Sequence, residues 1–77
     1  MKITWKWLES DMRDFPHVKS ASEDMEVDEG SCETLQDLVW RISTEIYLRH
    51  GIVVPTERSV STHVENWNFL KEMFNVS

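Results

Sequence analysis

The chain has 77 residues, of which 40% are hydrophobic and 29% charged, and its formal net charge is −6. This length allows one small domain, here residues 1–77. The negative charge disfavours general binding to DNA, RNA or anionic membranes, and no apolar run approaches the roughly 20 residues that a membrane-spanning helix needs.

The cysteine content and the N-terminal residues bear on location. Cys32 is the single cysteine, so no internal disulfide can form. No apolar signal core follows the first residues, and acids stand there instead. We therefore expect a cytoplasmic protein in a reducing environment.

The first 15 residues carry two competing periodicities. Four apolar residues recur at helical spacing: Trp5, Leu8, Met12 and Phe15. They predict a helix that Thr4 caps and Pro16 ends. The alternation of Ile3, Trp5 and Trp7 favours instead a strand near residues 2–7. We expect the helix and keep the short strand as the alternative.

Residues 16–30 form a polar segment without a sustained period, and we expect a long acidic surface loop there. The loop overlaps with a longer stretch, residues 20–40, that contains no Lys or Arg. This stretch holds half of the 14 carboxylates of the chain: Glu23, Asp24, Glu26, Asp28, Glu29, Glu33 and Asp37.

The next segment gives the clearest helical signal. Ser31 is the expected N-cap, and Gly51 is the expected C-terminal stop. One narrow apolar stripe lies between them: Leu35, Leu38, Val39, Ile42 and Ile46. Residues 52–55 then form an extended connector.

A third helix is expected to begin after Thr56 and to continue toward Phe74. Val60, Val64 and Trp67 share its apolar face. The expected fold class is therefore all-α: a small three-helix domain with a long acidic loop between the first two helices.

Four aromatic side chains fall off the expected core faces: Trp7, Trp40, Tyr47 and Phe69. Two interpretations stay open. The side chains pack into the wide buried arc that a three-helix fold offers, or some lie exposed beside acidic groups and anchor a protein partner. Trp40 and Tyr47 lie on the same flank of the second helix and are the favoured anchor pair.

Metal binding and catalysis find little support in the sequence. Cys32, His17, His50 and His63 lack the closely spaced ligand pairs that are typical of zinc sites. Neither a nucleophile elbow nor a glycine-rich phosphate loop is present. We expect no enzymatic activity, no metal and no cofactor.

Residues 50–64 look like the turn and the start of a helix-turn-helix recognition helix. Six polar residues would face outward: Arg58, Ser61, Thr62, Glu65, Asn66 and Asn68. Arg and Asn read bases well, although phosphate contacts need Lys and Arg, and this helix offers just Arg58 and Lys71. A DNA-binding regulator that uses the helix from Thr56 is one alternative.

Three short segments form another pattern: Asp28-Glu29-Gly30-Ser31, Glu33-Thr34-Leu35-Gln36 and Ile52-Val53-Val54-Pro55. This pattern resembles the acyl carrier proteins, which are acidic, similar in size, and built from a first helix, a long loop, a helix headed by a modified serine, and a final helix. The resemblance implies that Ser31 carries phosphopantetheine. The chain departs from the family at its Asp-Ser-Leu motif, where it has Gly-Ser-Cys at residues 30–32.

The leading hypothesis is a non-enzymatic protein-binding module, an inhibitor or regulator that docks on a basic protein surface, such as one that normally holds nucleic acid. The seven carboxylates of residues 20–40 would steer the approach, and Trp40 and Tyr47 would anchor the contact. Small acidic blockers of this kind are typical of phage products. The sequence leaves the oligomeric state open, a homodimer included.

Overall fold

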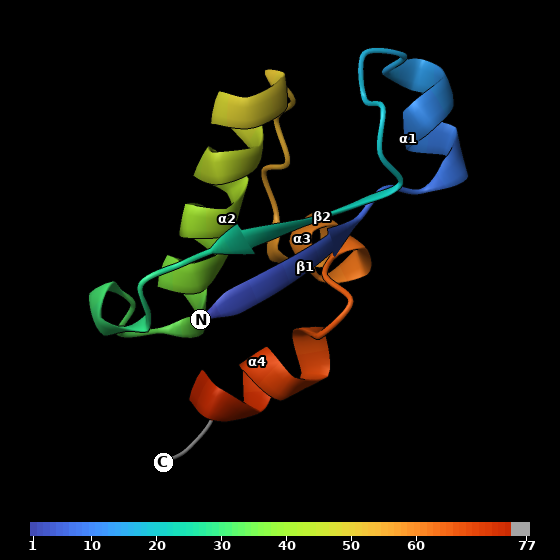
Figure 1. Ribbon diagram of the computed structural model, residues 1–77. Coiled ribbons are helices and arrows are strands. Elements are labelled where there is room, and N and C mark those ends of the chain that lie inside the picture. The colour runs from blue at the N-terminus through green and yellow to red at the C-terminus, as the bar shows by residue number, and fades with distance from the viewer. Residues whose placement is uncertain (75–77) are drawn as a thin grey trace.

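The structure, a computed structural model, describes residues 1–74, apart from the side chain of Glu29. In chain order the elements are β1 (Lys2–Lys6), α1 (Glu9–Asp14), β2 (Ser22–Glu26), the 3₁₀ turn η1 (Glu29–Ser31), α2 (Leu35–His50), α3 (Glu57–His63) and α4 (Trp67–Phe74) (Figure 1). The expected all-α class is wrong. In the described residues the chain is a small α/β mix of four α-helices and a two-stranded antiparallel sheet.

The N-terminal segment is a strand, so the expected first helix is wrong and the strand alternative is confirmed. β1 pairs with β2 in the register Lys2↔Glu26 through Lys6↔Ser22. Because side chains alternate across a strand, Ile3, Trp5 and Trp7 all enter the core. Burying three large side chains from six residues outweighs the helical spacing, and helix α1 begins only after Leu8.

The expected loop over residues 16–30 contains β2 and η1, so that prediction is also wrong. The alternation of β2 is concealed because an acidic residue occupies an inward position. Glu23 faces inward beside Met25 and Val27, while Asp24 and Glu26 are exposed. A strand pattern is hard to recognise when a carboxylate takes the place of one of its apolar residues.

Helix α2 is confirmed, with a corrected start. Thr34, not Ser31, is the N-cap: its Oγ1 accepts from the amide of Asp37 at 3.2 Å, and Asp37 Oδ2 accepts from the amide of Thr34 at 3.2 Å. This reciprocal pair is a capping box, which satisfies donors that a bare helix start leaves open. Gly51 ends the helix with φ 69°, a backbone conformation that glycine adopts without steric cost.

The expected third helix is divided in two. Thr56 caps α3 as predicted, since its hydroxyl accepts from the amide of Ser59 at 3.1 Å. The helix then ends at His63, because Val64 turns extended, with φ −85° and ψ 114°. Val64 forms an antiparallel bridge with Trp5 of β1, and the chain becomes helical again only at α4.

The residues that interrupt this helix complete the outer edge of β1. The amide of Glu65 donates to Thr4 O at 2.8 Å. The side chain of Asn66 accepts from the Thr4 amide at 3.3 Å and donates to Lys2 O at 3.1 Å. An uncovered strand edge leaves backbone groups unpaired, and these contacts favour breaking the helix here.

The core lies between the inner face of the sheet and helix α2. Its fully buried side chains come from β1, α2, α3 and α4: Ile3, Trp5, Leu38, Ile42, Ile46, Val60 and Leu70. The molecule measures 41 × 20 × 19 Å, with α1 toward one end and α4 at the other (Figure 1). Within the described residues, every helix is too short or too polar to cross a membrane.

Candidate protein-binding surface

The solvent-facing side of α2 carries a row of large side chains, which we call the α2 ridge: Trp40, Thr44, Tyr47 and Leu48. Trp40 is 70% exposed, Tyr47 55% and Leu48 72%. They recur at intervals of four, three and one residues, so they share one helix face. The buried residues of α2 lie on the opposite face, which leaves the ridge entirely to solvent.

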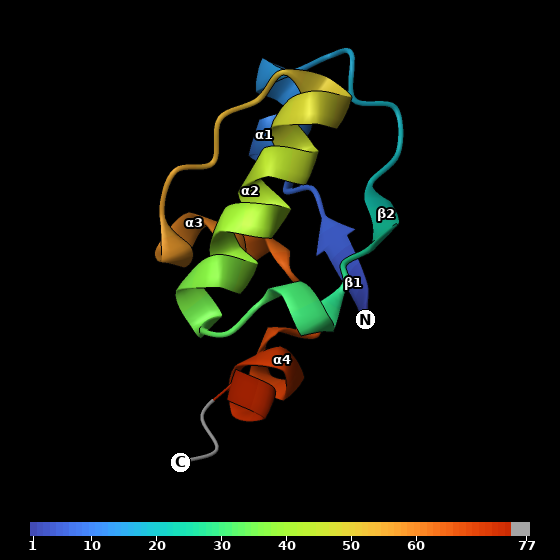
Figure 2. The same ribbon diagram turned by 90° about the vertical axis from the view of Figure 1, so that its left-hand side faces the viewer.

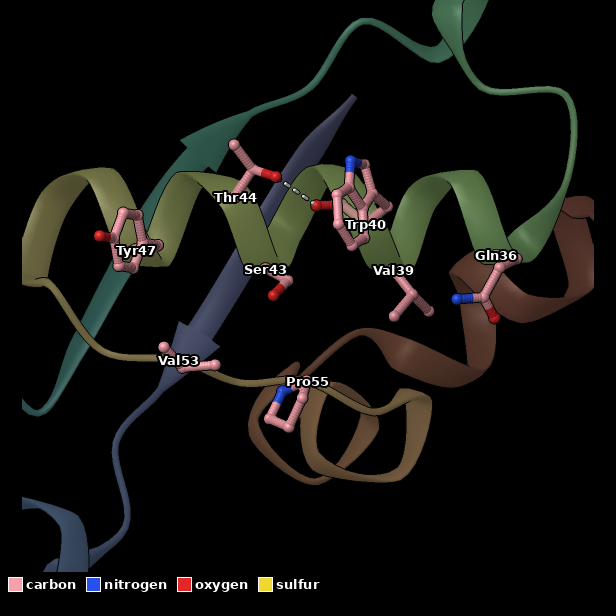
Figure 3. A pocket seen from close by; sticks show the side chains of 8 residues that line it. All are labelled: Gln36, Val39, Trp40, Ser43, Thr44, Tyr47, Val53 and Pro55. Carbon is pink, nitrogen blue, oxygen red and sulfur yellow. Dashed lines mark hydrogen bonds between the residues drawn. The ribbon is translucent and has the colours of Figure 1, made fainter.

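A shallow groove of about 340 Å³ lies beside the ridge, between α2 and the connector at residues 52–55. Figure 3 shows Val39 and Ser43 pointing toward the connector, with Val53 and Pro55 across from them. The hydroxyl of Ser43 donates to Val54 O at 2.7 Å and ties the connector to the helix. Val53 is 69% exposed, so the apolar surface of the ridge continues across the groove.

The structure places the predicted acidic residues in several environments. Asp24, Glu26, Asp28, Glu33 and Asp37 are exposed, and Glu23 is half-buried. Two exposed carboxylates already have cationic neighbours: Asp24 lies 3.4 Å from Lys2 Nζ, and Glu26 lies 3.0 Å from the N-terminal amino group. Because of these neighbours, Asp24 and Glu26 contribute less to the negative electrostatic field of the protein than the sequence suggested.

The predicted partner-binding residues do not form one surface. Trp40 and Tyr47 lie together on the ridge, and Glu33 and Asp37 lie at the N-terminal end of the same helix. The strand β2, which carries Glu23, Asp24 and Glu26, runs along the other side of α2 from the connector (Figure 2). The aromatic pair therefore has acidic neighbours at the helix start, separate from the acids of β2.

Glu23 is part of the folded framework. Its carboxylate accepts from His50 Nε2 at 2.9 Å, from Trp7 Nε1 at 3.1 Å and from Arg49 Nη1 at 3.4 Å. Burial opposes ionisation of Glu23, but hydrogen bonds from His50 and Trp7, the charge of His50 and the Arg49 contact outweigh it, and the pKa falls below its usual value. This carboxylate fastens β2 to the end of α2.

A second, partly buried contact joins α1 to α3. The ring of His63 stacks on Trp5 with 4.7 Å between ring centroids and an interplanar angle of 8°. Its Nε2 lies 2.6 Å from Asp11 Oδ2, and its Nδ1 lies 2.7 Å from Ser59 O. Both ring nitrogens face oxygen acceptors, so the ring connects α1, α3 and β1.

Sequence reasoning missed this framework of histidines, tryptophans and carboxylates. It rejected His50 and His63 as metal ligands and gave them no other role, and it placed Trp7 off the core face because it expected a helix. Trp7 is buried. The pairing of Asp11 with His63 spans 52 residues, and no local pattern signals it. Within residues 1–74, no three His, Cys, Asp or Glu side chains gather in a metal-binding arrangement.

Some residues of the two alternative interpretations lie outside the helices in which those interpretations place them. Of the expected recognition helix, Glu65 and Asn66 lie between α3 and α4 and bond to β1. Ser31 lies in η1, three residues before the N-cap, and its hydroxyl donates to Asp28 O at 2.7 Å.

The chain was compared with protein-family models, with curated proteins and with solved structures, and none of these comparisons found a match.

Proposed function

We propose that this protein is a non-enzymatic binding module, an inhibitor or regulator that docks through the α2 ridge on a basic surface of a second protein. The observation that carries the proposal is the exposure of Trp40, with Tyr47 and Leu48 beside it, on a helix face that the core does not use. Exposed apolar patches with a polar rim mark interaction sites, and Trp and Tyr supply much of the binding energy of protein interfaces.

The charge at the start of α2 and of the whole chain supports a basic partner. Glu33 and Asp37 are exposed at the start of α2, and the whole chain carries a net charge of −6. Opposite charges on the two proteins accelerate association and favour one orientation, while the apolar contact determines how long the complex lasts. The association rate therefore falls as salt screens the charges.

The proposal includes a cytoplasmic location. Cys32 is a buried, free thiol, and reducing compartments keep such thiols unpaired.

The test begins with a pull-down from a host lysate at low salt, followed by titration of the purified partner. Trp40→Ala is expected to weaken binding at least tenfold, because a central aromatic anchor commonly contributes about 2 kcal/mol or more. Phe69→Ala is the matched control: Phe69 is exposed on α4, away from the ridge, and its removal leaves the affinity unchanged. Equal affinities of the wild-type protein and the Trp40 variant would overturn the proposed anchor.

The charge contribution is tested separately. Glu33→Gln is expected to lower the association rate at low salt and to have no effect at high salt. Glu72→Gln, on exposed α4, carries the same charge change and serves as the control. An association rate that is insensitive to salt would contradict steering by charge.

A further inference from the structure

The α2 ridge has a layout that is complementary to itself. Trp40 and Leu48 stand four residues to either side of Thr44, a distance of about 6 Å along the helix axis in each direction. A hollow lies between them, lined by Trp40, Arg41, Thr44, Glu45 and Leu48. If a two-fold axis relates two copies at Thr44, Trp40 of each copy lies at the level of Leu48 of the other copy. The two small Thr44 side chains then meet at the centre of the contact.

The charges beside the ridge are complementary under the same operation. An antiparallel pair centred on Thr44 offsets Arg41 from Glu45 of the second copy by two residues, about 3 Å along the axis, which a long Arg side chain can span. Arg41 takes no part in the ion pairs found within residues 1–74. Glu45 binds Arg49 through Oε1 at 3.0 Å, so its second oxygen is available to the partner copy.

From this symmetry we infer that two copies of the chain associate through an antiparallel α2–α2 contact. The exposed fractions of Trp40, Tyr47 and Leu48, applied to large side chains of roughly 200 Å² each, give on the order of 400 Å² buried per copy. The two copies together would bury about 800 Å², which is below the roughly 1,200 Å² at which stable specific interfaces begin, and both copies are acidic. The dimer is therefore weak and reversible, and it forms at high protein concentration.

Self-association covers the same residues that the proposed function assigns to the partner. The regulatory consequence, which rests on that proposed function, is competition: the dimer shields Trp40 from solvent, and a tighter-binding partner separates the two copies. The dimer itself does not depend on the proposed function, because it is measured on the protein alone.

The first test is sedimentation equilibrium of the purified chain over a wide concentration range at physiological salt. We expect a monomer–dimer equilibrium, and Trp40→Ala is expected to weaken it at least tenfold. Phe69→Ala leaves it unchanged. A wild-type protein that stays monomeric at the highest concentration, or a dimer that is indifferent to Trp40→Ala, would overturn the inference.

The second test uses charge reversal. Arg41→Glu and Glu45→Arg each place like charges across the contact, so each variant alone is expected to self-associate at least tenfold more weakly than the wild type. An equimolar mixture restores opposite charges at both positions and is expected to recover association. Each substitution shifts the net charge of −6 by two, so the two variants, at −8 and −4, both stay acidic and gain no overall attraction.

The control for this mixture is a pair with the same net charges but with substitutions away from the ridge. Lys71→Glu and Glu65→Arg change exposed positions, and mixing them should leave association as it is in each variant alone. Far-ultraviolet circular dichroism establishes that all four variants are folded. If the ridge variants fold but their mixture stays monomeric, the antiparallel pairing is wrong. Failure of this test leaves partner binding, which is measured by titration, unaffected.

Discussion

The molecule uses its tryptophans in two opposite ways. At the sheet, Trp5 and Trp7 are buried, and their rings pack against His63 and His50. On α2, Trp40 is exposed on the face opposite the core. A domain of this size buries only about 60% of the surface of its unfolded chain, so large rings inside are needed for stability. Trp40 contributes little to this small core, so its ring is available for binding.

The largest expected loss of stability is at the buried tryptophans. Trp5→Ala removes a fully buried ring and its stacking on His63, and truncation of this kind typically costs about 3–5 kcal/mol. Small domains have roughly 5–15 kcal/mol of stability, so we expect a large loss of folded population in urea unfolding. Trp40→Ala is the counterpart and is expected to change stability by less than about 0.5 kcal/mol. Similar losses in the two variants would remove the distinction between the two regions.

A smaller loss is expected at the contact between α1 and α3. Asp11→Asn removes the charge that His63 Nε2 faces at 2.6 Å and that also accepts from the Leu8 amide at 3.2 Å at the start of α1. Hydrogen bonds to charged groups contribute about 1.5–3 kcal/mol. The free energy of unfolding in urea measures the loss. Asp14→Asn, at an exposed position of the same helix, is the control, and an equal change in both variants would show that the contact with His63 contributes nothing.

Glu23, which accepts a hydrogen bond from the buried Trp7, makes the stability of the protein depend on pH. The pKa of Glu23 is lowered in the folded state, so its contribution to stability is fully present above the unfolded pKa, about 4.3, and is lost as the pH falls through the folded value. Glu23→Gln is therefore expected to be less stable than the wild type at pH 7, with the difference shrinking below about pH 4. Urea unfolding of both proteins at pH 7, 5 and 3 measures it. A constant difference across this range would contradict the assignment to ionisation.

The smallest expected effect is on the exposed face of α2, and a buried residue of the same helix is the reference. Leu48→Ala, at an exposed position, is expected to change stability by less than about 0.5 kcal/mol. Ile46→Ala, two residues earlier but fully buried, is expected to cost about 2–5 kcal/mol. Thermal unfolding followed by circular dichroism compares the two, and a costly Leu48 variant would show that the ridge supports the fold.

The sequence predicted α2 well because its signals are local. The stripe from Leu38 to Ile46 and the stop at Gly51 lie next to each other in the chain. The angular positions of Trp40 and Tyr47 placed both off the stripe but left open whether they are buried or exposed, and the structure shows them exposed. Only the N-cap was misplaced, since both Ser31 and Thr34 are suitable capping residues.

The remaining errors have causes outside the local sequence. β1 carried two periodicities, and its pairing with residues 22–26 decided between them. The inward Glu23 concealed β2 because its partners, His50 and Arg49, lie far along the chain. The break near Val64 follows from a bridge to Trp5, and an isolated helix has no signal for it. Whether the carboxylates and aromatic residues bind a partner stays a prediction.

The side chain of Asn66 pairs with the free edge of β1, and this contact affects the order of folding. The contact between Thr4 and Asn66 spans 62 residues, so β1 lacks one of its two neighbours until Asn66 is available. Long-range closure of this kind slows folding. During synthesis, we expect the antiparallel pair of β1 and β2 to remain labile until the segment that precedes α4 has emerged.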